Sequence, residues 1–247
     1  MAAEASRDDH HLVIDIRDLL FRWDDAAPVV LALGQLSIAP GEHVFIEGPS
    51  GSGKSTLLSL LAGVTAALRG SVRVLGKDLE RLSSIERDHF RADHIGYIFQ
   101  MFNLIPYLSV VENVTLPCRF SPSRRAKAIA RTGSLEHEAR RLLEHLDMAH
   151  GDLLDRPVTT LSVGQQQRVA AARALMGSPE LLIADEPTSA LDADRRESFV
   201  RLLFEECRQA GSTLVFVSHD ASLERLFGRT VNLAALNEAP HAAEATS

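Results

Sequence analysis

The sequence predicts an α/β fold in which a mostly parallel sheet is covered by helices. Apolar runs at 43–47, 181–184 and 213–217 have the length and composition of short buried strands. A helical pattern at 195–209 lies between the last two runs, as a connection between parallel strands requires. Residues 48–55 join a predicted strand directly to a predicted helix. These three observations indicate an α/β core.

Further strands and helices are predicted on both sides of these runs. Residues 12–16 and 29–38 alternate as strands, and Pro40-Gly41 forms a turn after the second. After the 43–47 strand, the predicted elements are a helix at 55–62, a strand at 71–75, a helix at 85–91, a strand at 94–99 and a last strand at 231–236.

The character of the chain changes between residues 100 and 177. Short apolar patches alternate there with polar helical segments, and apolar residues at helical spacing predict a helix at 135–146. Residues 121–134 are basic and have the composition of a loop. We therefore expect a single domain over 10–236. Its parts are a core at about 10–99 and 178–236, a helical insertion at about 100–177 and flexible ends at 1–9 and 237–247.

Length and composition limit the classes of protein to consider. At 247 residues the chain has room for one large domain with a modest insertion. No uninterrupted apolar stretch reaches the length of a membrane span, and the polar N-terminus has no apolar signal core. Cys118 and Cys207 are too few for a disulfide framework or a metal site, so we expect reduced thiols. The net charge of −7 argues against a nucleic-acid partner.

Residues 48–55 read G-P-S-G-S-G-K-S and match the phosphate-binding pattern G-x-x-x-x-G-K-[S/T] at every constrained position. The glycines let the backbone curl so that successive N–H groups point at phosphates. Lys54 supplies a positive charge for those phosphates, and the Ser55 hydroxyl is a ligand for Mg²⁺. The predicted nucleotide-binding residues are Gly48, Pro49, Ser50, Gly51, Ser52, Gly53, Lys54, Ser55 and Thr56. We expect a nucleoside triphosphate at this helix N-terminus.

Two carboxylates follow the apolar strand at 181–184. The end of a strand beside a phosphate loop is where an α/β sheet presents its ligands. Asp185 is predicted to bind Mg²⁺ directly or through its water, and Glu186 to polarise the water that attacks the γ-phosphorus.

A second anion-binding helix start is predicted at 161–168, L-S-V-G-Q-Q-Q-R. Ser162 is a good N-cap, and Gly164 leaves the first helical N–H groups unobstructed. One chain rarely needs two such helix starts for one nucleotide. The second is expected to serve a neighbouring molecule.

Taken together, six ordered motifs resemble those of ATP-binding cassette (ABC) ATPases. They are the phosphate loop, Gln100 after an apolar strand, L-S-V-G-Q, L-L-I-A-D-E-P, and the pair S-A-L-D at 189–192 with S-H-D at 218–220. The resemblance covers roughly residues 10–236. It implies a P-loop NTPase core with an N-terminal antiparallel β subdomain and a helical subdomain, with ATP and Mg²⁺ as ligands.

The resemblance also assigns roles to single residues. Trp23 falls where the family places an aromatic that stacks on adenine, with Phe21 as the competing candidate. Asp192 resembles the aspartate that crosses to a second subunit. The implied catalytic residues are Glu186, His219, Gln100 and Lys54, and the implied Mg²⁺ ligands are Ser55, Gln100 and Asp185. The residues implied to cover ATP bound to another chain are Ser162, Val163, Gly164 and Gln165.

Val163 departs from the family pattern L-S-G-G-Q. A β-branched residue is costly where the backbone requires a positive φ. Ser162 and Gly164, the expected γ-phosphate contacts, are intact. We therefore expect activity to be retained.

The resemblance implies two kinds of partner. A second copy of the chain, or a homologous cassette, closes head-to-tail over two ATP molecules and reopens after hydrolysis. A membrane subunit receives the force in a groove formed after Gln100, with Phe102, Leu104, Tyr107 and Leu108 as the candidate contacts; core packing is the alternative role for part of this apolar stretch. A basic cluster, Arg124, Arg125, Lys127 and Arg131, is interpreted as a solvated loop, with anionic lipid contact as the alternative.

Residues 91–114 look most like the ATPase subunits of the lipoprotein-releasing and macrolide-exporter class. Partners in this class have few membrane spans and a large extracytoplasmic domain. The implied location is the cytoplasmic face of the inner membrane, and the implied role is export or extraction of a substrate. An ATPase that gates an extracytoplasmic enzyme or division factor is the main alternative, and a cassette acting away from membranes is a more distant one.

Overall fold

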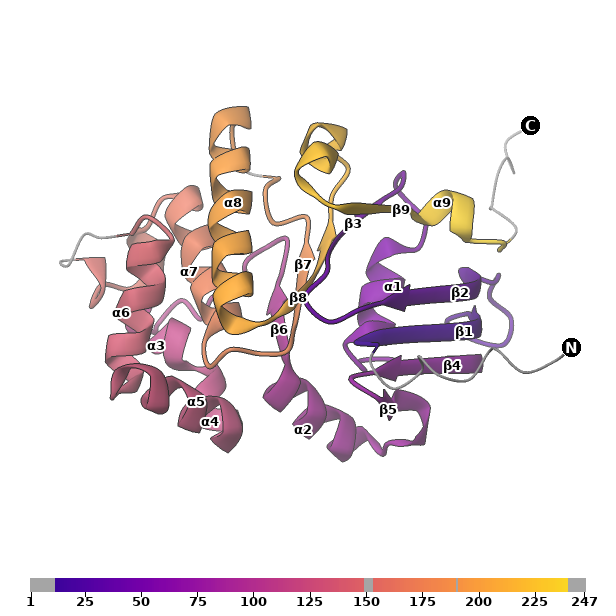
Figure 1. Cartoon of the computed structure of the whole chain (residues 1–247), viewed down its shortest axis with the longest axis horizontal. Helices are drawn as coiled ribbons and strands as arrows, with labels where there is room; N and C mark the ends of the chain where they lie inside the picture. Colours follow the sequence, from indigo (N-terminus) through magenta and orange to yellow (C-terminus); the bar gives the residue numbers. More distant parts are fainter. Residues whose placement is uncertain (1–11, 149–152, 190, 240–247) are drawn as a thin grey trace, which may run out of the picture.

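The larger sheet has five parallel strands in the order β6-β7-β8-β3-β9 (Figure 1). This computed structural model describes residues 12–148, 153–189 and 191–239. The strands are β3 (His43–Glu47), β6 (Ile95–Ile98), β7 (Leu181–Asp185), β8 (Thr213–Val217) and β9 (Arg229–Asn232). Val217 pairs with Ile46 on one side and with Asp185 on the other. The segments that follow β3, β7 and β8 therefore emerge at one edge of the sheet.

A second, antiparallel sheet has the order β2-β1-β4-β5. Its strands are β1 (Ile14–Phe21), β2 (Leu31–Ile38), β4 (Arg69–Val74) and β5 (Lys77–Asp78). Strand β1 is longer than the predicted 12–16 because its pairing with β2 and β4 continues past an irregularity at Arg17/Leu20. The expected combination of a parallel core sheet and an N-terminal antiparallel sheet is confirmed.

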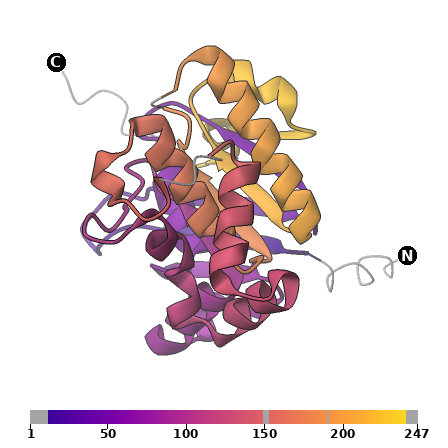
Figure 2. The same ribbon diagram turned by 90° about the vertical axis from the view of Figure 1, so that its left-hand side faces the viewer.

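Helices surround the parallel sheet and form the insertion. They are α1 (Lys54–Leu61), α2 (Ser84–His94), α3 (Val110–Thr115), α4 (Pro117–Phe120), α5 (Pro122–Thr132), α6 (Leu135–His145), α7 (Val163–Leu175), α8 (Ala193–Ala210) and α9 (Leu233–Leu236). Short 3₁₀ turns lie at Leu79–Arg81, Val158–Thr160 and Ala221–Leu226. Helices α3 to α7 gather on the side of the molecule away from the antiparallel sheet, as Figures 1 and 2 show.

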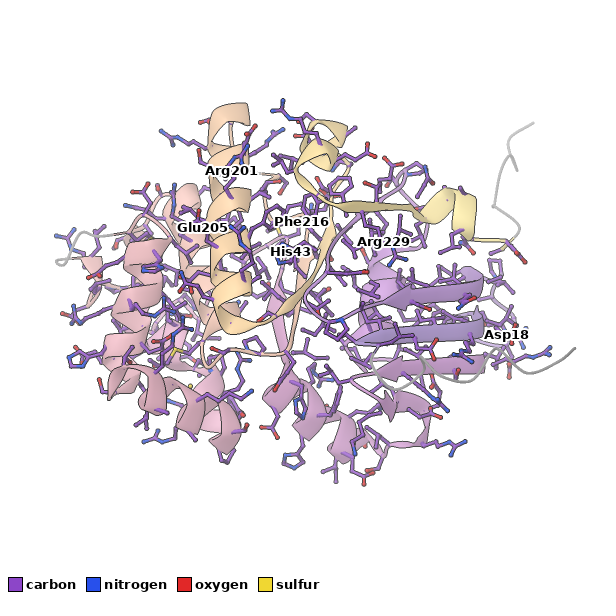
Figure 3. The ribbon with its side chains drawn as sticks, viewed as in Figure 1. Asp18, His43, Arg201, Glu205, Phe216 and Arg229 are labelled. Atoms are coloured by element: carbon purple, nitrogen blue, oxygen red, sulfur yellow. The ribbon has the colours of Figure 1, made fainter. Side chains whose placement is uncertain are left out.

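Two apolar clusters hold these layers together. On one face of the parallel sheet, side chains of α1 such as Leu57 and Leu58 pack with Ile183 of β7 and Ile16 of β1. On the other face, α8 and the helical insertion share a cluster that includes Phe216 of β8. Figure 3 shows Phe216 beside α8, and Arg201 and Glu205 on that helix, where both are exposed.

The basic segment 121–134 forms helix α5, so its prediction as a loop is wrong. Ser121 caps the helix, Pro122 occupies its first turn and Gly133 ends it at φ 87°. Arg124 is 3% exposed and donates to the backbone carbonyls of Met176, Ala174 and Ile95. Lys127 pairs with Glu180, and Arg131 donates to Ser178 and Gln209. Three of the four cluster members thus fasten α5 to neighbouring segments, and only Arg125 matches the solvated interpretation.

The end of the described chain also differs from its prediction. The expected strand at 231–236 stops at Asn232, whose side chain accepts from the N–H of Ala235 and so starts α9. Asn237 is 7% exposed and hydrogen-bonded, so it belongs to the folded part although a flexible end was expected from this residue onward. The predicted flexible segments at 1–9 and 240–247 lie outside the described residues.

Candidate nucleotide-binding and catalytic site

The phosphate loop connects β3 to α1, as predicted. Gly53 occupies the N-cap of α1 with φ 94°, and no side chain caps the helix there. The first N–H groups of α1 are therefore open to an anion. Gly51, at φ 80°, is a second position that favours glycine. Lys54 Nζ donates to the carbonyls of Gly48 at 2.6 Å and Pro49 at 2.9 Å, so its ammonium already lies over the loop.

A cavity of about 440 Å³ brings most predicted site residues together. It is lined by Val30, Ser50, Gly51, Gly53, Lys54, Ser55, Thr56, Gln100, Asp185, Glu186 and His219. The loops after three parallel strands meet here because those strands end in register. The cavity therefore joins the phosphate loop to the acidic strand end, to Gln100 and to His219.

Glu186 is held in an uncommon backbone conformation at the end of β7. Its φ is 48°, and its N–H donates to the carbonyl of Val217 at 2.9 Å. Its side chain is 12% exposed, and Oε2 lies 2.7 Å from Nδ1 of His219. Oε2 is buried, and it makes no aligned hydrogen bond with the described residues. A carboxylate oxygen with unused acceptor capacity at the cavity wall suits a water-polarising role.

Asp185 has the chemistry of a cation ligand. Burial raises the pKa of Asp185, the charge of Glu186 raises it further, and Lys54 and the hydroxyl of Tyr97 oppose the shift. A carboxylate that is costly to charge gains from a nearby cation. Ser55 and Gln100 line the same cavity and supply oxygen ligands, which Mg²⁺ prefers. Within the described ranges no three His, Cys, Asp or Glu residues converge on a metal.

The two aromatic candidates for stacking on adenine differ in their exposure. Phe21 is 3% exposed within β1, whereas Trp23 is 61% exposed and meets the Phe21 ring edge-to-face at 5.0 Å. Phe21 is therefore a core residue, and the free face of Trp23 is available for a base.

The signature segment starts α7 and lies outside this cavity. Ser162 is the N-cap and forms a capping box with Gln165. Val163 begins the helix with an ordinary negative φ and is 50% exposed, so this β-branched residue causes no backbone strain. Asp192 caps α8 through the N–H of Arg195 and is likewise exposed.

A second cavity, of about 510 Å³, lies where α2, β6, α4 and α7 meet. It is lined by Asp88, His89, Arg91, Ala92, Ile95, Tyr97, Phe99, Pro117, Phe120, Arg124, Arg173 and Ala174. The predicted groove residues Phe102, Leu104, Tyr107 and Leu108 are not among this described lining. Leu104 packs against the core, and Tyr107 is 82% exposed. Sequence reasoning missed Phe99 and Phe120. The low aromatic content of the chain is the only sequence signal that draws attention to them, and their exposure is seen only in the fold.

Comparison with known proteins agrees with this site. The family model for ABC transporters matches residues 33–189. The chain belongs to the ABC transporter family. This membership confirms the expected fold and ATPase activity, and relatives named for lipoprotein release and macrolide export confirm the likeness to that class. The cassette is an ATPase subunit of a transporter, and its nucleotide is ATP.

The ABC cassette has relatives of several kinds. The ABC transporter ATP-binding protein YbbA of Escherichia coli strain K12 is 41% identical over 81% of this chain and 83% of its own length. The lipoprotein-releasing system ATP-binding protein LolD of Shewanella denitrificans is 38% identical over 80% of this chain and 81% of its own. The macrolide export ATP-binding/permease protein MacB of Marinobacter nauticus is 37% identical over 90% of this chain but only 33% of its own length.

A solved structure supports the same assignment. The cassette MJ0796, in a dimeric post-hydrolysis state bound to ADP and Pi, superimposes with a TM-score of 0.77. It is 33% identical and matches 90% of this chain and 95% of its own. No helix in the described ranges of the present cassette combines the length and apolar character that crossing a membrane requires.

Proposed function

We propose that this cassette hydrolyses ATP as a head-to-tail dimer and drives a separate membrane subunit of the lipoprotein-releasing or macrolide-exporter kind. The observation that carries the proposal is the division of the site. Lys54, Gln100, Asp185, Glu186 and His219 share one cavity, while the signature residues lie elsewhere on the same chain. A second copy would bring its signature helix to the open side of the cavity.

The cavity residues suit in-line attack on a γ-phosphate. Lys54 would exchange its two carbonyl partners for phosphate oxygens. Glu186 would orient the attacking water and accept its proton through Oε2, which lies 2.7 Å from Nδ1 of His219. Ser55, Gln100 and Asp185 would hold Mg²⁺, which supplies charge stabilisation when bound.

From the other chain, Ser162 and the N–H group of Gly164 would cover the phosphate. Ser162 and the first turn of α7 carry no acidic side chain that would repel an anion. The role of Asp192 would be to contact the opposite subunit near this junction.

The second cavity is the proposed docking place of the membrane subunit. It contains exposed Phe99 and Phe120, and Phe99 directly precedes Gln100. An apolar cytoplasmic helix of the partner would thus rest one residue from the nucleotide site. The cassette would then reside at the cytoplasmic face of the inner membrane. Export or extraction follows from the likeness to LolD and MacB, whose names state lipoprotein release and macrolide export.

The dimer is tested with Glu186→Gln. Removing the base should leave ATP binding intact and slow hydrolysis by about 10²-fold or more. ATP should therefore convert the variant from monomer to dimer in sedimentation velocity. Glu205→Gln, at an exposed position of α8 (Figure 3), is the matched control and should behave as the parent. A monomeric Glu186→Gln protein that still hydrolyses ATP would sink the assignment.

A further inference from the structure

Asn237 uses the whole hydrogen-bonding capacity of its side chain. Its Oδ1 accepts from the backbone N–H of Ala32 at 2.8 Å and of Ala239 at 3.1 Å. Its Nδ2 donates to the carbonyls of Val30 at 2.9 Å and Ser52 at 3.4 Å. Two acceptor sites and two donors are all that a carboxamide has. The orientation of the amide follows from these partners, because two of them are donors and two are acceptors.

These partners lie on both sides of a close contact. A side chain at Gly53 would place its Cβ 2.6 Å from Cδ2 of Leu31 and 3.4 Å from the carbonyl oxygen of Val30. Ser52 precedes Gly53 in the phosphate loop, and Val30 and Ala32 flank Leu31. Asn237 is therefore bonded to both backbone segments where the phosphate loop meets strand β2.

The same segment of β2 leads to the proposed base-stacking residue. Val30 lines the nucleotide cavity, and its N–H donates to the carbonyl of Phe21 at 2.8 Å, two residues before Trp23. Asn237 itself is anchored at both sides. Its N–H donates to the carbonyl of Leu233 at the start of α9, and the next N–H, of Glu238, donates to that of Ala32 at 2.9 Å.

We propose that Asn237 is a positioning residue for nucleotide binding. It sets the spacing between the phosphate loop and the β2 segment next to Trp23, so that one nucleotide fits both. The inference rests on the proposed nucleotide site and deepens it. A loop held in its binding conformation before the ligand arrives loses less conformational entropy on binding. Loss of the hydrogen bonds made by the Asn237 side chain should therefore weaken nucleotide binding more than it slows the chemical step.

The test is Asn237→Asp in the full chain. Aspartate keeps the shape and the two accepted bonds but cannot donate to Val30 and Ser52. Trp23 is the single tryptophan, so its fluorescence reports ADP binding without hydrolysis. We expect the dissociation constant for ADP to rise about tenfold. The KM for ATP should rise alike while kcat stays within about twofold, the pattern of lost uniform binding.

Asn113→Asp is the matched control. Asn113 is buried like Asn237, accepts from the N–H of Ile105 and donates to the carbonyls of Ile105, Leu108 and Ser109. Its partners all lie in the helical insertion, away from the phosphate loop. This variant should lose thermal stability with an unchanged ADP dissociation constant. The inference fails if Asn237→Asp binds ADP as the parent does, or if Asn113→Asp weakens binding equally.

A measurement on the parent protein covers the case in which Asn237→Asp does not fold. The side-chain amide protons of Asn237 should exchange slowly with solvent and shift in ¹⁵N-resolved NMR spectra when ADP is added. Fast exchange without a shift overturns the inference. Lys54→Ala distinguishes failure of this inference from failure of the proposed nucleotide site. If Lys54→Ala binds ADP as the parent does, the proposed site is wrong. If Lys54→Ala weakens ADP binding but Asn237→Asp does not, only the role of Asn237 is refuted.

Discussion

Val163 departs from the family motif without straining the backbone of the signature segment. The first helical position after an N-cap accepts most residues, and Val163 occupies it with a negative φ and a half-exposed side chain. We expect Gly164, not Val163, to be the position that matters for approach to a ligand. In its own chain, a Cβ at Gly164 would lie 3.5 Å from Cδ2 of Leu191, which is ordinary contact. Any damage from a larger residue there would arise with a neighbouring molecule.

We therefore predict opposite outcomes for two substitutions in one helical turn. Val163→Gly should leave ATP hydrolysis within about threefold of the parent and change the free energy of unfolding by less than about 1 kcal/mol. Gly164→Ala should fold as stably as the parent but lose ATP-driven dimerisation, because its methyl group would meet ATP on the second copy. Steady-state ATPase assays and sedimentation measure both. A parent protein that barely responds to ATP and is rescued by Val163→Gly would contradict this view.

At the scale of elements, the sequence predicted best where function depends on local spacing. The phosphate loop, the D-E strand end and the capped start of α7 each depend on a few consecutive residues, and the structure places all three as expected. Helix α5 was missed although Ser121, Pro122 and Gly133 are start and stop signals. Composition misled here, because a basic segment was taken for a solvated loop. Its basic side chains instead contact groups that are distant in the sequence, such as the carbonyls bound by Arg124. The second cavity was missed for a related reason: Asp88 and Phe120 come together only in the fold.

Arg124 provides the prediction for α5. Its guanidinium lies at the C-terminal end of α7, where carbonyl groups lack helical partners and the helix dipole favours a cation. Burial lowers the pKa of Arg124 to about 10, which still leaves it charged at neutral pH. Arg124→Met should lower the free energy of unfolding by about 2–4 kcal/mol because buried carbonyls lose their donors. Arg125→Met, one residue along on the exposed face, should change it by less than about 0.5 kcal/mol. If chemical denaturation shows the same loss of stability for Arg124→Met and Arg125→Met, the stabilising role of Arg124 is refuted.

At the scale of the whole molecule, the two cavities lie on either side of a short stretch of chain. Tyr97 and Phe99 line the second cavity, their rings stacked at 4.3 Å, and Gln100 lines the nucleotide cavity. Tyr97 also lies close enough to Asp185 for its hydroxyl to lower the pKa of that carboxyl. An occupant of the second cavity would therefore touch side chains that reach the catalytic groups. It would also touch both the core, through α2, and the insertion, through α4.

This arrangement predicts that docking and hydrolysis can be separated by mutation. Phe120 is 65% exposed on α4 and touches the second cavity, not the first. Phe120→Asp would place a charge in an apolar contact, so we expect at least tenfold less membrane subunit to copurify with the tagged cassette from solubilised membranes. The ATPase rate of the isolated cassette should stay within about twofold. Leu68→Asp, at a 51% exposed leucine preceding β4, is the control and should retain the partner. Undiminished copurification with Phe120→Asp would place the docking surface elsewhere, with exposed Tyr107 as the next candidate. Recovery of the cassette with ribosomes instead of a membrane protein would contradict the transporter role itself.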